Sequence, residues 1–340
     1  MSTIRRVTLQ FRDGASHMLD VCAGQSVLDA ALKAQVPVLH QCQSGTCSSC
    51  TATLADGTAT TRAGASTTLL RSEFDAGQRL LCVTEPQTDC TFTLNYDISA
   101  GQGKPAKARA FIDAIEHVAH NVVRLTLELA EADWLEFKPG QFLQLTVPGL
   151  GVVRSYSPAS TVSDLPTIVL LVRLLPDGAM SNYLRQRAAP DDVLEIEGPF
   201  GNFFLRDKVR APHIMVAGGT GLAPMLSMID SMRRASGRRP PMLLSFGCAT
   251  PDDLFCLDDI ALRQQWLPTL KTRASVDRGA HGDLLTGNPV AALCESDVTD
   301  ADTVAYLCGP PPMVEAAIAR LQALGVRREN IHAEQFTPAS

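Results

Sequence analysis

Four cysteines near the N-terminus have a spacing that suits metal chemistry. Cys42, Cys47 and Cys50 lie in one short stretch, HQCQSGTCSSC, and Cys82 follows in RLLCVTEP. The order C-x4-C-x2-C…C is the plant-type spacing of the thiolates that hold a [2Fe–2S] cluster. Small residues such as Gly45 let such a loop curl tightly, with backbone N–H groups turned toward the cluster. A zinc site and scattered structural thiols are the alternatives, but zinc sites more often show two C-x2-4-C pairs, so the sequence favours the iron–sulfur cluster.

Two polar motifs further along the chain suit phosphate groups and a flat ring. The first, RSYS, follows a strand-like stretch and offers a cation, an aromatic ring and a hydroxyl at neighbouring positions. The second, GAMSNYL, places glycine and serine where a helix begins, and a helix N-terminus attracts phosphate through its free N–H groups. Taken alone, the first motif is more often an ordinary strand with a solvated arginine. The candidate residues are Arg154, Ser155, Tyr156 and Ser157 in the first motif, and Gly178, Met180 and Ser181 in the second.

Two glycine-containing turns after apolar strands predict a dinucleotide site. GGTGLAP comes directly after the stretch His213 to Ala217 and opens a helix, and its glycines allow close approach of a pyrophosphate. It departs from the G-x-G-x-x-G fingerprint because Pro224 occupies the third glycine position, where proline suits the first helical turn. CGPPPM ends a second strand at the edge where open α/β sheets place ligands, or is only a stiff strand-to-helix turn. The candidate residues are Gly218, Gly219, Thr220, Gly221 and Pro224, with Cys308, Gly309 and Pro310.

The composition is that of a soluble globular protein with neither nucleic acid nor membrane as a partner. Hydrophobic residues make up 45% and charged residues 19% of the 340 residues, which argues against disorder. A formal net charge of −6 does not provide the basic face that nucleic acid requires. No apolar run reaches membrane-spanning length, and the N-terminus shows no apolar signal-peptide core. Ten cysteines without an export signal indicate a reducing compartment, and we expect the cytoplasm.

The elements that must position these motifs change in kind along the chain. The N-terminal part mixes short alternating stretches with one helix, which Ser26 caps, with Asp29 three residues later. The stretch from Ser99 to Ala108 is small, polar and without periodicity, which predicts a linker. Beyond it the pattern suggests a closed antiparallel barrel, and from His213 strands and helices alternate as in a parallel sheet. We predict a small mixed domain at 1–98, a linker at 99–107, a barrel domain at 108–208 and an α/β domain at 209–340.

Six motifs in a fixed order resemble one known superfamily. The cysteine loop, RSYS, GAMSNYL, GGTGLAP, CGPPPM and a near-terminal EQF are similar to those of the ferredoxin–NAD(P)H reductase superfamily. More narrowly, the chain resembles the reductase component of bacterial ring-hydroxylating dioxygenases of the benzoate, toluate and anthranilate type. The resemblance covers essentially the whole chain. It implies a β-grasp plant-type ferredoxin domain (α+β), an antiparallel β-barrel flavin domain and an α/β Rossmann-like nucleotide-binding domain.

The resemblance implies a flavin role for the two polar motifs. Arg154 would contact the flavin pyrophosphate or nearby phosphate oxygens. Tyr156 would pack on the flavin, and Ser157 would hydrogen-bond near its N5. Ser181, with its helix start, would bind the FAD pyrophosphate.

The resemblance also implies how the nicotinamide would be held. The turn Gly219 to Gly221 would hold the dinucleotide, Cys308 would lie beside the nicotinamide ring, and Glu334 would lie near the hydride path. Phe336 resembles the C-terminal aromatic that covers the isoalloxazine and moves when nicotinamide stacks. The candidate catalytic residues are Ser157, Cys308, Glu334 and Phe336.

The chain departs from the family pattern at two places. The family's cluster loop often reads C-R-E-G-x-C-G-x-C, whereas this chain has Gln43, Ser44 and Ser48. Losing that charged pair and glycine would shift the cluster potential or the docking of a partner. The second departure is that Thr337 to Ser340 extend past the aromatic residue, unlike reductases that end on it.

The choice of NADH over NADPH depends on the residues after the stretch LLSFG. That stretch is followed by Ala249 to Asp253, which include no arginine to meet a 2′-phosphate. A carboxylate such as Asp253 suits a ribose diol. Acidic residues that favour a helix dipole explain the same pattern equally well.

These cofactors predict one electron path. Nicotinamides give a hydride, which carries two electrons, whereas a [2Fe–2S] centre takes one, so a flavin is needed between them. We expect electrons to pass from NADH to FAD, to the [2Fe–2S] cluster and then to a terminal oxygenase, with the chain as a monomer. The alternatives are a reductase for a di-iron monooxygenase of phenols or alkanes, a redox-sensing module, and a carrier ferredoxin fused to an inert domain.

Overall fold

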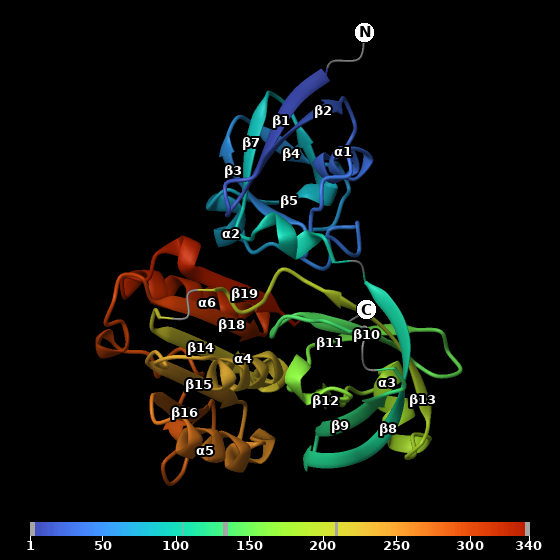
Figure 1. The fold of residues 1–340 in the computed structure, drawn as a ribbon. Helices are drawn as coiled ribbons and strands as arrows, with labels where there is room; N and C mark the ends of the chain where they lie inside the picture. The colour runs from blue at the N-terminus through green and yellow to red at the C-terminus, as the bar shows by residue number, and fades with distance from the viewer. Residues whose placement is uncertain (1–3, 104, 132–134, 208–209, 337–340) are drawn as a thin grey trace. The chain divides into compact units, whose positions relative to one another are not determined.

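The chain folds into two compact units. Figure 1 shows the computed structural model, which describes residues 4–103, 105–131, 135–207 and 210–336. The first unit comprises Met1–Pro105 and Phe200–Asn202, and the second comprises Ala106–Pro199 and Phe203–Ser340. The predicted tail, residues 337–340, lies outside the described residues. All ten cysteines are free thiols. Over the described ranges, no helix combines the length and the apolar character needed to cross a membrane.

The first unit is built on a mixed five-stranded sheet. Its strand order is β2-β1-β7-β3-β5, with β1 parallel to β7 and antiparallel to β2, and a separate two-stranded sheet pairs β4 with β6. This arrangement is the predicted α+β domain. The elements are β1 (Ile4–Phe11), β2 (Ser16–Cys22), α1 (Val27–Lys33), β3 (Thr51–Asp56), β4 (Ala59–Thr61), α2 (Arg71–Asp75), β5 (Gln78–Leu80), the 3-10 helix η1 (Leu81–Val83), β6 (Thr84–Pro86), β7 (Cys90–Leu94) and η2 (Ile98–Gly101).

Helix α1 begins where its capping residues predict. The Ser26 hydroxyl accepts a hydrogen bond from the N–H of Asp29 at 3.1 Å, and the Asp29 carboxylate accepts from the N–H of Ser26 at 3.4 Å. A cap of this kind stabilises a helix by about 0.5–2 kcal/mol. The helix then buries Val27, Leu28 and Ala31 on the side that faces the unit's interior.

The second unit starts with an antiparallel barrel. Six strands follow the order β11-β10-β13-β8-β9-β12. A bridge between Pro158 and Leu170 and a hydrogen bond from the N–H of Ala159 to the carbonyl of Val169 (2.7 Å) close the sheet on itself. The elements are β8 (Ala106–Ala119), β9 (Val122–Leu129), β10 (Phe142–Thr146), β11 (Val153–Tyr156), η4 (Val162–Asp164), β12 (Thr167–Arg173), α3 (Ala179–Gln186) and β13 (Val193–Phe200).

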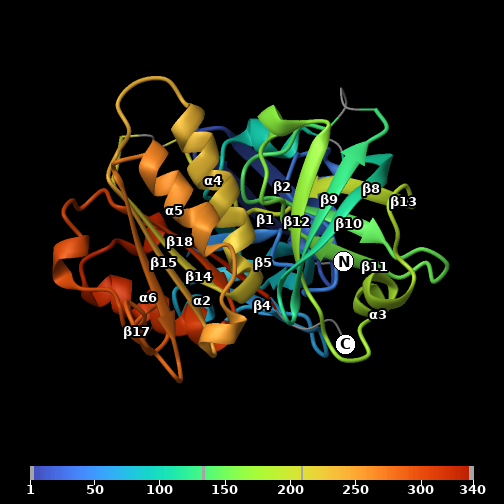
Figure 2. The same ribbon diagram turned by 90° about the horizontal axis from the view of Figure 1, so that it is seen from below.

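The second unit continues as a parallel sheet with helices on both faces. The strand order is β17-β16-β15-β14-β18-β19, and each neighbouring pair is parallel. Figure 2 shows α4 and α5 on one face of this sheet and α6 on the other. The elements are β14 (His213–Gly218), η5 (Gly219–Gly221), α4 (Leu222–Arg234), β15 (Met242–Cys248), η6 (Pro251–Asp253), α5 (Leu257–Trp266), β16 (Leu270–Val276), β17 (Leu285–Thr286), η7 (Glu295–Asp297), β18 (Val304–Gly309), α6 (Pro311–Ala323), η8 (Arg328–Asn330) and β19 (Ile331–Gln335).

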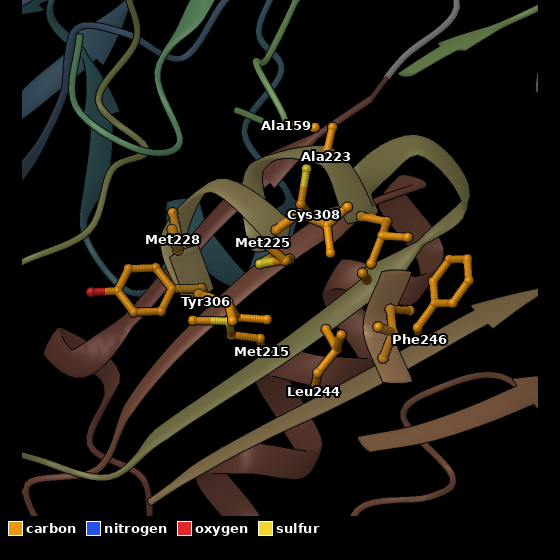
Figure 3. Close-up of a cluster of buried hydrophobic side chains, with 14 of the residues drawn as sticks. Ala159, Met215, Ala223, Met225, Met228, Leu244, Phe246, Tyr306 and Cys308 are labelled. Carbon is orange, nitrogen blue, oxygen red and sulfur yellow. The ribbon is translucent and has the colours of Figure 1, made fainter. Parts of the chain in front are cut away.

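One apolar cluster joins this sheet, helix α4 and the barrel (Figure 3). Met215 and Leu244 come from the sheet, and Met225 and Met228 come from α4. Ala159, from the barrel, belongs to the same cluster. Burial of each larger side chain contributes about 1.5–3 kcal/mol. Helix α4 is therefore the element through which the barrel and the parallel sheet share one core.

The stretch predicted as a linker carries more regular structure than its composition suggests. Helix η2 covers Ile98–Gly101, and strand β8 already starts at Ala106. Only Ala110 and Ile112 are buried among the residues of β8. The apolar alternation of this strand is therefore too weak to reveal where it begins.

Candidate functional site

The four predicted ligand cysteines come together from two elements of the first unit. Cys42, Cys47 and Cys50 lie in the loop that leads into β3, and Cys82 is the central residue of η1. The N–H of Leu81 donates to the carbonyl oxygen of Cys50 at 3.1 Å. This hydrogen bond holds η1, and with it Cys82, beside the loop.

The loop turns its backbone toward the Cys42 sulfur. The N–H groups of Ser44 and Thr46 donate to Cys42 Sγ at 3.4 and 3.3 Å. Gly45 between them has φ of +85°, and a Cβ atom there would lie 2.0 Å from the carbonyl oxygen of Ser66. Only glycine fits this position. Hydrogen bonds to a ligand sulfur stabilise the thiolate and tune a cluster's reduction potential.

The four thiols interact as two pairs. The hydrogen bond between Cys42 and Cys47 lowers the pKa of Cys42 to about 3 and raises the pKa of Cys47. The hydrogen bond between Cys50 and Cys82 raises the pKa of Cys50 and lowers that of Cys82. In residues 4–103, 105–131, 135–207 and 210–336, no three His, Cys, Asp or Glu side chains are grouped to hold a single metal ion. Two thiol pairs fit a binuclear iron centre better than a tetrahedral zinc site.

Strand β11 presents the RSYS motif next to β10. The register pairs Tyr156 with Leu143, and because side chains alternate along a strand, Arg154 and Tyr156 share one face while Ser155 lies on the other. Burial raises the pKa of Tyr156. Ser157 is only 4% exposed, and its hydroxyl has no hydrogen-bond partner among the described residues. A buried hydroxyl without a partner fits a site that a polar ligand atom completes.

Helix α3 carries the second polar motif of the barrel, GAMSNYL, at its start. The Ser181 hydroxyl accepts a hydrogen bond from the N–H of Leu175 at 2.9 Å, which closes the turn before the helix and leaves its own proton available to a phosphate oxygen. Gly178 packs against it, since a Cβ there would lie 2.9 Å from Ser181 Oγ. Met180 lies in the barrel core at 2% exposure, so its side chain serves packing.

In the α/β part, the glycine turn packs directly on the end of β18. A Cβ on Gly221 would lie 2.1 Å from the carbonyl oxygen of Cys308, and one on Gly218 would lie 2.7 Å from the Met313 sulfur. Gly219 has φ of +55°, in the left-handed region that favours glycine. The motifs GGTGLAP and CGPPPM therefore form one site at the carboxyl edge of the sheet, where open α/β sheets bind ligands.

The other predicted residues of this edge shape the two turns. Thr220 is half-buried in η5, and Pro224 is buried in the first turn of α4, where its missing N–H costs nothing. Pro310 precedes α6 as its N-cap residue. A Cβ on Gly309 would lie 3.1 Å from the backbone nitrogen of Gly218, so the two turns touch through their backbones.

Strands β18 and β19 bring the candidate catalytic residues of the α/β part together. Cys308 is paired in register with Glu334, and burial, followed by the nearby charge of Glu334, raises the pKa of the Cys308 thiol. Glu334 as a residue is half-buried, but its Oε2 atom is buried and has no hydrogen-bond partner among the described residues. Burial raises the pKa of the Glu334 carboxyl to about 8. The N–H of Phe336 donates to the carbonyl of Gly309 at 2.9 Å, and its ring packs on the apolar cluster of Figure 3.

Asp253 has contacts that differ from a ribose-binding carboxylate. Its Oδ2 accepts from the N–H and hydroxyl of Thr250 at 3.1 and 2.7 Å, and its Oδ1 accepts from the side-chain amide of Asn121 in the barrel at 3.0 Å. The carboxylate therefore caps η6 and joins the two parts of the unit. This geometry agrees with the helix-terminus interpretation, and a ribose role for Asp253 stays a prediction.

Sequence reasoning missed the polar contacts that join the barrel to the α/β part. Three of them are Asn121 with Asp253, Ser160 with Ser227, and Asp164 with Arg234. Their partners lie 132, 67 and 70 residues apart, so no local spacing reveals them. The available signal is that Thr161 with Asp164, and Thr250 with Asp253, have the T-x-x-D pattern of a capping box.

Three domain families match the chain in succession. The 2Fe-2S iron-sulfur cluster binding domain matches residues 10–87. The oxidoreductase FAD-binding domain matches residues 109–205, and the oxidoreductase NAD-binding domain matches residues 215–318. Each match contains the motif that predicted the same cofactor, so the chain carries sites for a [2Fe–2S] cluster, FAD and a nicotinamide dinucleotide.

Several known proteins are similar to the chain over nearly its whole length. The chain is 31% identical to the propane 2-monooxygenase reductase component of Mycolicibacterium smegmatis, with 94% of each chain covered. It is 30% identical to the 2-halobenzoate 1,2-dioxygenase electron transfer component of Burkholderia cepacia, with 98% of each covered. Among solved structures, the Amycolatopsis cytochrome P450 reductase GcoB is 28% identical with a TM-score of 0.72, covering 98% of this chain and all of that one.

Proposed function

Because the chain belongs to the family of reductase, or electron transfer, components of oxygenases, we propose that its electron acceptor is an aromatic-ring-hydroxylating dioxygenase of the Rieske type. The chain is an oxidoreductase in which NADH, FAD and a [2Fe–2S] cluster form one electron path. The observation that supports the proposed acceptor is the similarity to the 2-halobenzoate 1,2-dioxygenase electron transfer component, which extends over 98% of each chain.

The chain's own residues bind and align the cofactors. Bound FAD accepts a hydride and passes its electrons on singly, which is the chemistry that links NADH to the cluster. In our proposal the N–H groups of Gly219 to Gly221 hold the dinucleotide pyrophosphate, and the buried Ser157 hydroxyl meets a polar atom of the flavin. Glu334, whose pKa is about 8, is mostly protonated at pH 7 and can donate a hydrogen bond near the nicotinamide.

The proposal is tested by reconstitution with a purified ring-hydroxylating dioxygenase. We expect NADH-dependent formation of the dihydroxylated product when this protein is the only reductase present. A Cys82→Ser variant should keep its FAD and lose product formation, because a cluster ligand is missing. Rapid NADH oxidation with no product from several such dioxygenases would contradict the proposed acceptor.

A monooxygenase is the second candidate acceptor. The observation that favours it is the relative from Mycolicibacterium smegmatis, at 31% identity over 94% of each chain. The two candidates differ in a competition assay in which equal amounts of a Rieske dioxygenase and a di-iron monooxygenase share one reductase preparation. Product mainly from the monooxygenase would replace our first proposal with the second.

We also propose NADH as the preferred coenzyme, a monomeric state and a cytoplasmic location. The coenzyme preference rests on the absence of arginine between Ala249 and Asp253. Equal kcat/KM values for NADH and NADPH would contradict it. Light scattering of the holoenzyme measures the mass directly, and a dimer mass would overturn the monomer.

A further inference from the structure

Helix α4 connects the glycine turn to the barrel. It starts at Leu222, directly after η5, and ends at Arg234. Its thirteen residues correspond to a rod of about 20 Å. Met225 and Met228 of this rod share the apolar cluster of Figure 3 with Ala159 of the barrel. The middle of the helix therefore belongs to a core that it shares with the barrel.

Ser227 anchors the middle of the helix by a buried hydrogen bond. Its side chain is fully buried, and its hydroxyl donates to the carbonyl oxygen of Ser160 at 2.7 Å. Ser160 lies three residues after Ser157, whose buried hydroxyl is assigned to the flavin. Removing the Ser227 hydroxyl would leave the carbonyl of Ser160, a residue only 7% exposed, without this partner. The contact therefore ties α4 to the flavin edge of the barrel.

Arg234 anchors the end of the helix. Its guanidinium pairs with the Asp164 carboxylate at 2.5 Å and also donates to the hydroxyl of Thr161. The N–H and hydroxyl of Thr161 donate to the Asp164 carboxylate in a capping box, so both groups that Arg234 contacts are held in place. Ser227 and Arg234 are seven residues apart, which places them on the same face of the helix.

The barrel meets this helix through its backbone as well. Gly140 follows Pro139 in the turn before β10 and has φ of +105°. A Cβ there would lie 2.5 Å from the Met228 methyl group and 2.8 Å from the carbonyl oxygen of Phe203. The absence of a side chain lets the helix and the barrel backbone pack closely, which leaves little room for the helix to tilt.

We propose that Ser227 and Arg234 are positioning residues for hydride transfer. They fix the helix whose first turn holds the dinucleotide to the barrel segment that follows Ser157. On a rod of about 20 Å, a tilt of about 3° moves one end by about 1 Å, and a misplacement of that size can slow a reaction by about 10²-fold. The inference depends on the proposed roles of Gly219 to Gly221 and Ser157.

The test is anaerobic stopped-flow reduction of the flavin in the holoenzyme, using NADH and NADH deuterated at C4. We expect Ser227→Ala and Arg234→Gln each to lower the limiting rate constant of flavin reduction on the order of tenfold. The deuterium isotope effect should increase, because hydride transfer then limits the observed rate more completely. FAD content and the dissociation constant for NADH should stay within about twofold of wild type.

Two matched controls separate positioning from general loss of stability. Ser245 is fully buried and donates to the carbonyl of Pro289 at 2.7 Å, entirely within the α/β part. Arg233, next to Arg234, pairs with Asp230 and lies over the Trp266 ring within the same part. Ser245→Ala and Arg233→Gln therefore remove comparable contacts without touching the barrel, and we expect unchanged rate constants and isotope effects.

The possible outcomes are distinct. Wild-type rate constants in folded, FAD-loaded Ser227→Ala and Arg234→Gln would overturn the inference, as would equal slowing in Ser245→Ala. If Ser227→Ala does not fold, Arg234→Lys provides the test. Because this variant keeps the charge, it should recover part of the rate of flavin reduction that is lost in Arg234→Gln. No recovery would contradict a positioning role. Failure of NADH to reduce wild-type flavin would instead refute the electron path itself.

Discussion

His213 makes the α/β part sensitive to acid. It is the first residue of β14, only 1% exposed, and its ring stacks on Tyr306 with centroids 6.0 Å apart and an interplanar angle of 5°. Burial lowers the pKa of the imidazole from 6.5 to about 4, against a smaller opposing effect of the Ala211 backbone. The folded protein therefore holds this side chain uncharged at a pH where the unfolded chain protonates it.

The size of the effect follows from proton linkage. The stability that this neutral histidine preserves is fully present above pH 6.5 and is lost as the pH falls toward 4. At about 1.36 kcal/mol per pKa unit, the whole window is worth about 3 kcal/mol, and about 2 kcal/mol is lost by pH 5. For a folded unit of about 150–250 residues, a loss of about 2 kcal/mol lowers the Tm by about 4–8 °C. Although burial opposes it, hydrogen bonds lower the pKa of Asp164 and Asp253, so these carboxylates stay ionised at pH 5.

The assay is scanning calorimetry of the holoenzyme at pH 7.5 and pH 5.0. His213→Phe keeps an aromatic ring against Tyr306 and removes the titrating group. Between the two pH values, its Tm should fall by about 4–8 °C less than that of wild type. His281→Phe, at an exposed histidine, should behave as wild type. An equal fall in His213→Phe and wild type would refute the reasoning.

Three further variants test the site directly. Cys82→Ser should remain yellow, and NADH should still reduce its flavin, but its rate of cytochrome c reduction should fall by more than about tenfold. An unchanged rate would show that the cluster is not on the electron path. Gly221→Ala should slow flavin reduction by about 10²-fold, because its Cβ would lie 2.1 Å from the Cys308 carbonyl, while Gly103→Ala, which meets open space, should have no effect. The difference in Tm between Glu334→Gln and wild type should be more positive at pH 9 than at pH 5. The reason is that a buried carboxyl with a pKa of about 8 makes the wild-type protein less stable as the pH rises from 4.5 through 8. An equal difference at both pH values would contradict this.

Local patterns in the sequence predicted the elements whose signals are strong. The glycine turn predicts a helix that opens directly after it, and α4 starts at Leu222, the first residue past that turn. The antiparallel barrel predicted beyond the linker is likewise present, as the six-stranded sheet β11-β10-β13-β8-β9-β12. The family resemblance and the fold class are confirmed by the three matched domains and the full-length relatives. The predicted linker, 99–107, overlaps the start of β8 at Ala106, because most side chains of this strand are exposed and give little apolar alternation.

The spacing of residues along the sequence does not predict which side chains of the site contact each other. The cysteine pattern predicted four ligands, but only the folded loop shows that Cys42 pairs with Cys47 and Cys50 with Cys82. The ribose role predicted for Asp253 depends on the residues from Ala249 to Asp253, whereas its contact with Asn121 joins residues 132 apart in the chain, beyond any local pattern. Contacts of that range depend on how the barrel and the parallel sheet pack, which no local periodicity encodes.

The electron path from NADH through FAD to the cluster is tested most directly by an anaerobic reductive titration of the holoenzyme, followed by visible absorbance and electron paramagnetic resonance. The chain should take up three electrons, two on the flavin and one on the iron centre, and NADH alone should produce the signal of the reduced [2Fe–2S] cluster. Uptake of only two electrons, with no iron signal at any point of the titration, would contradict the account.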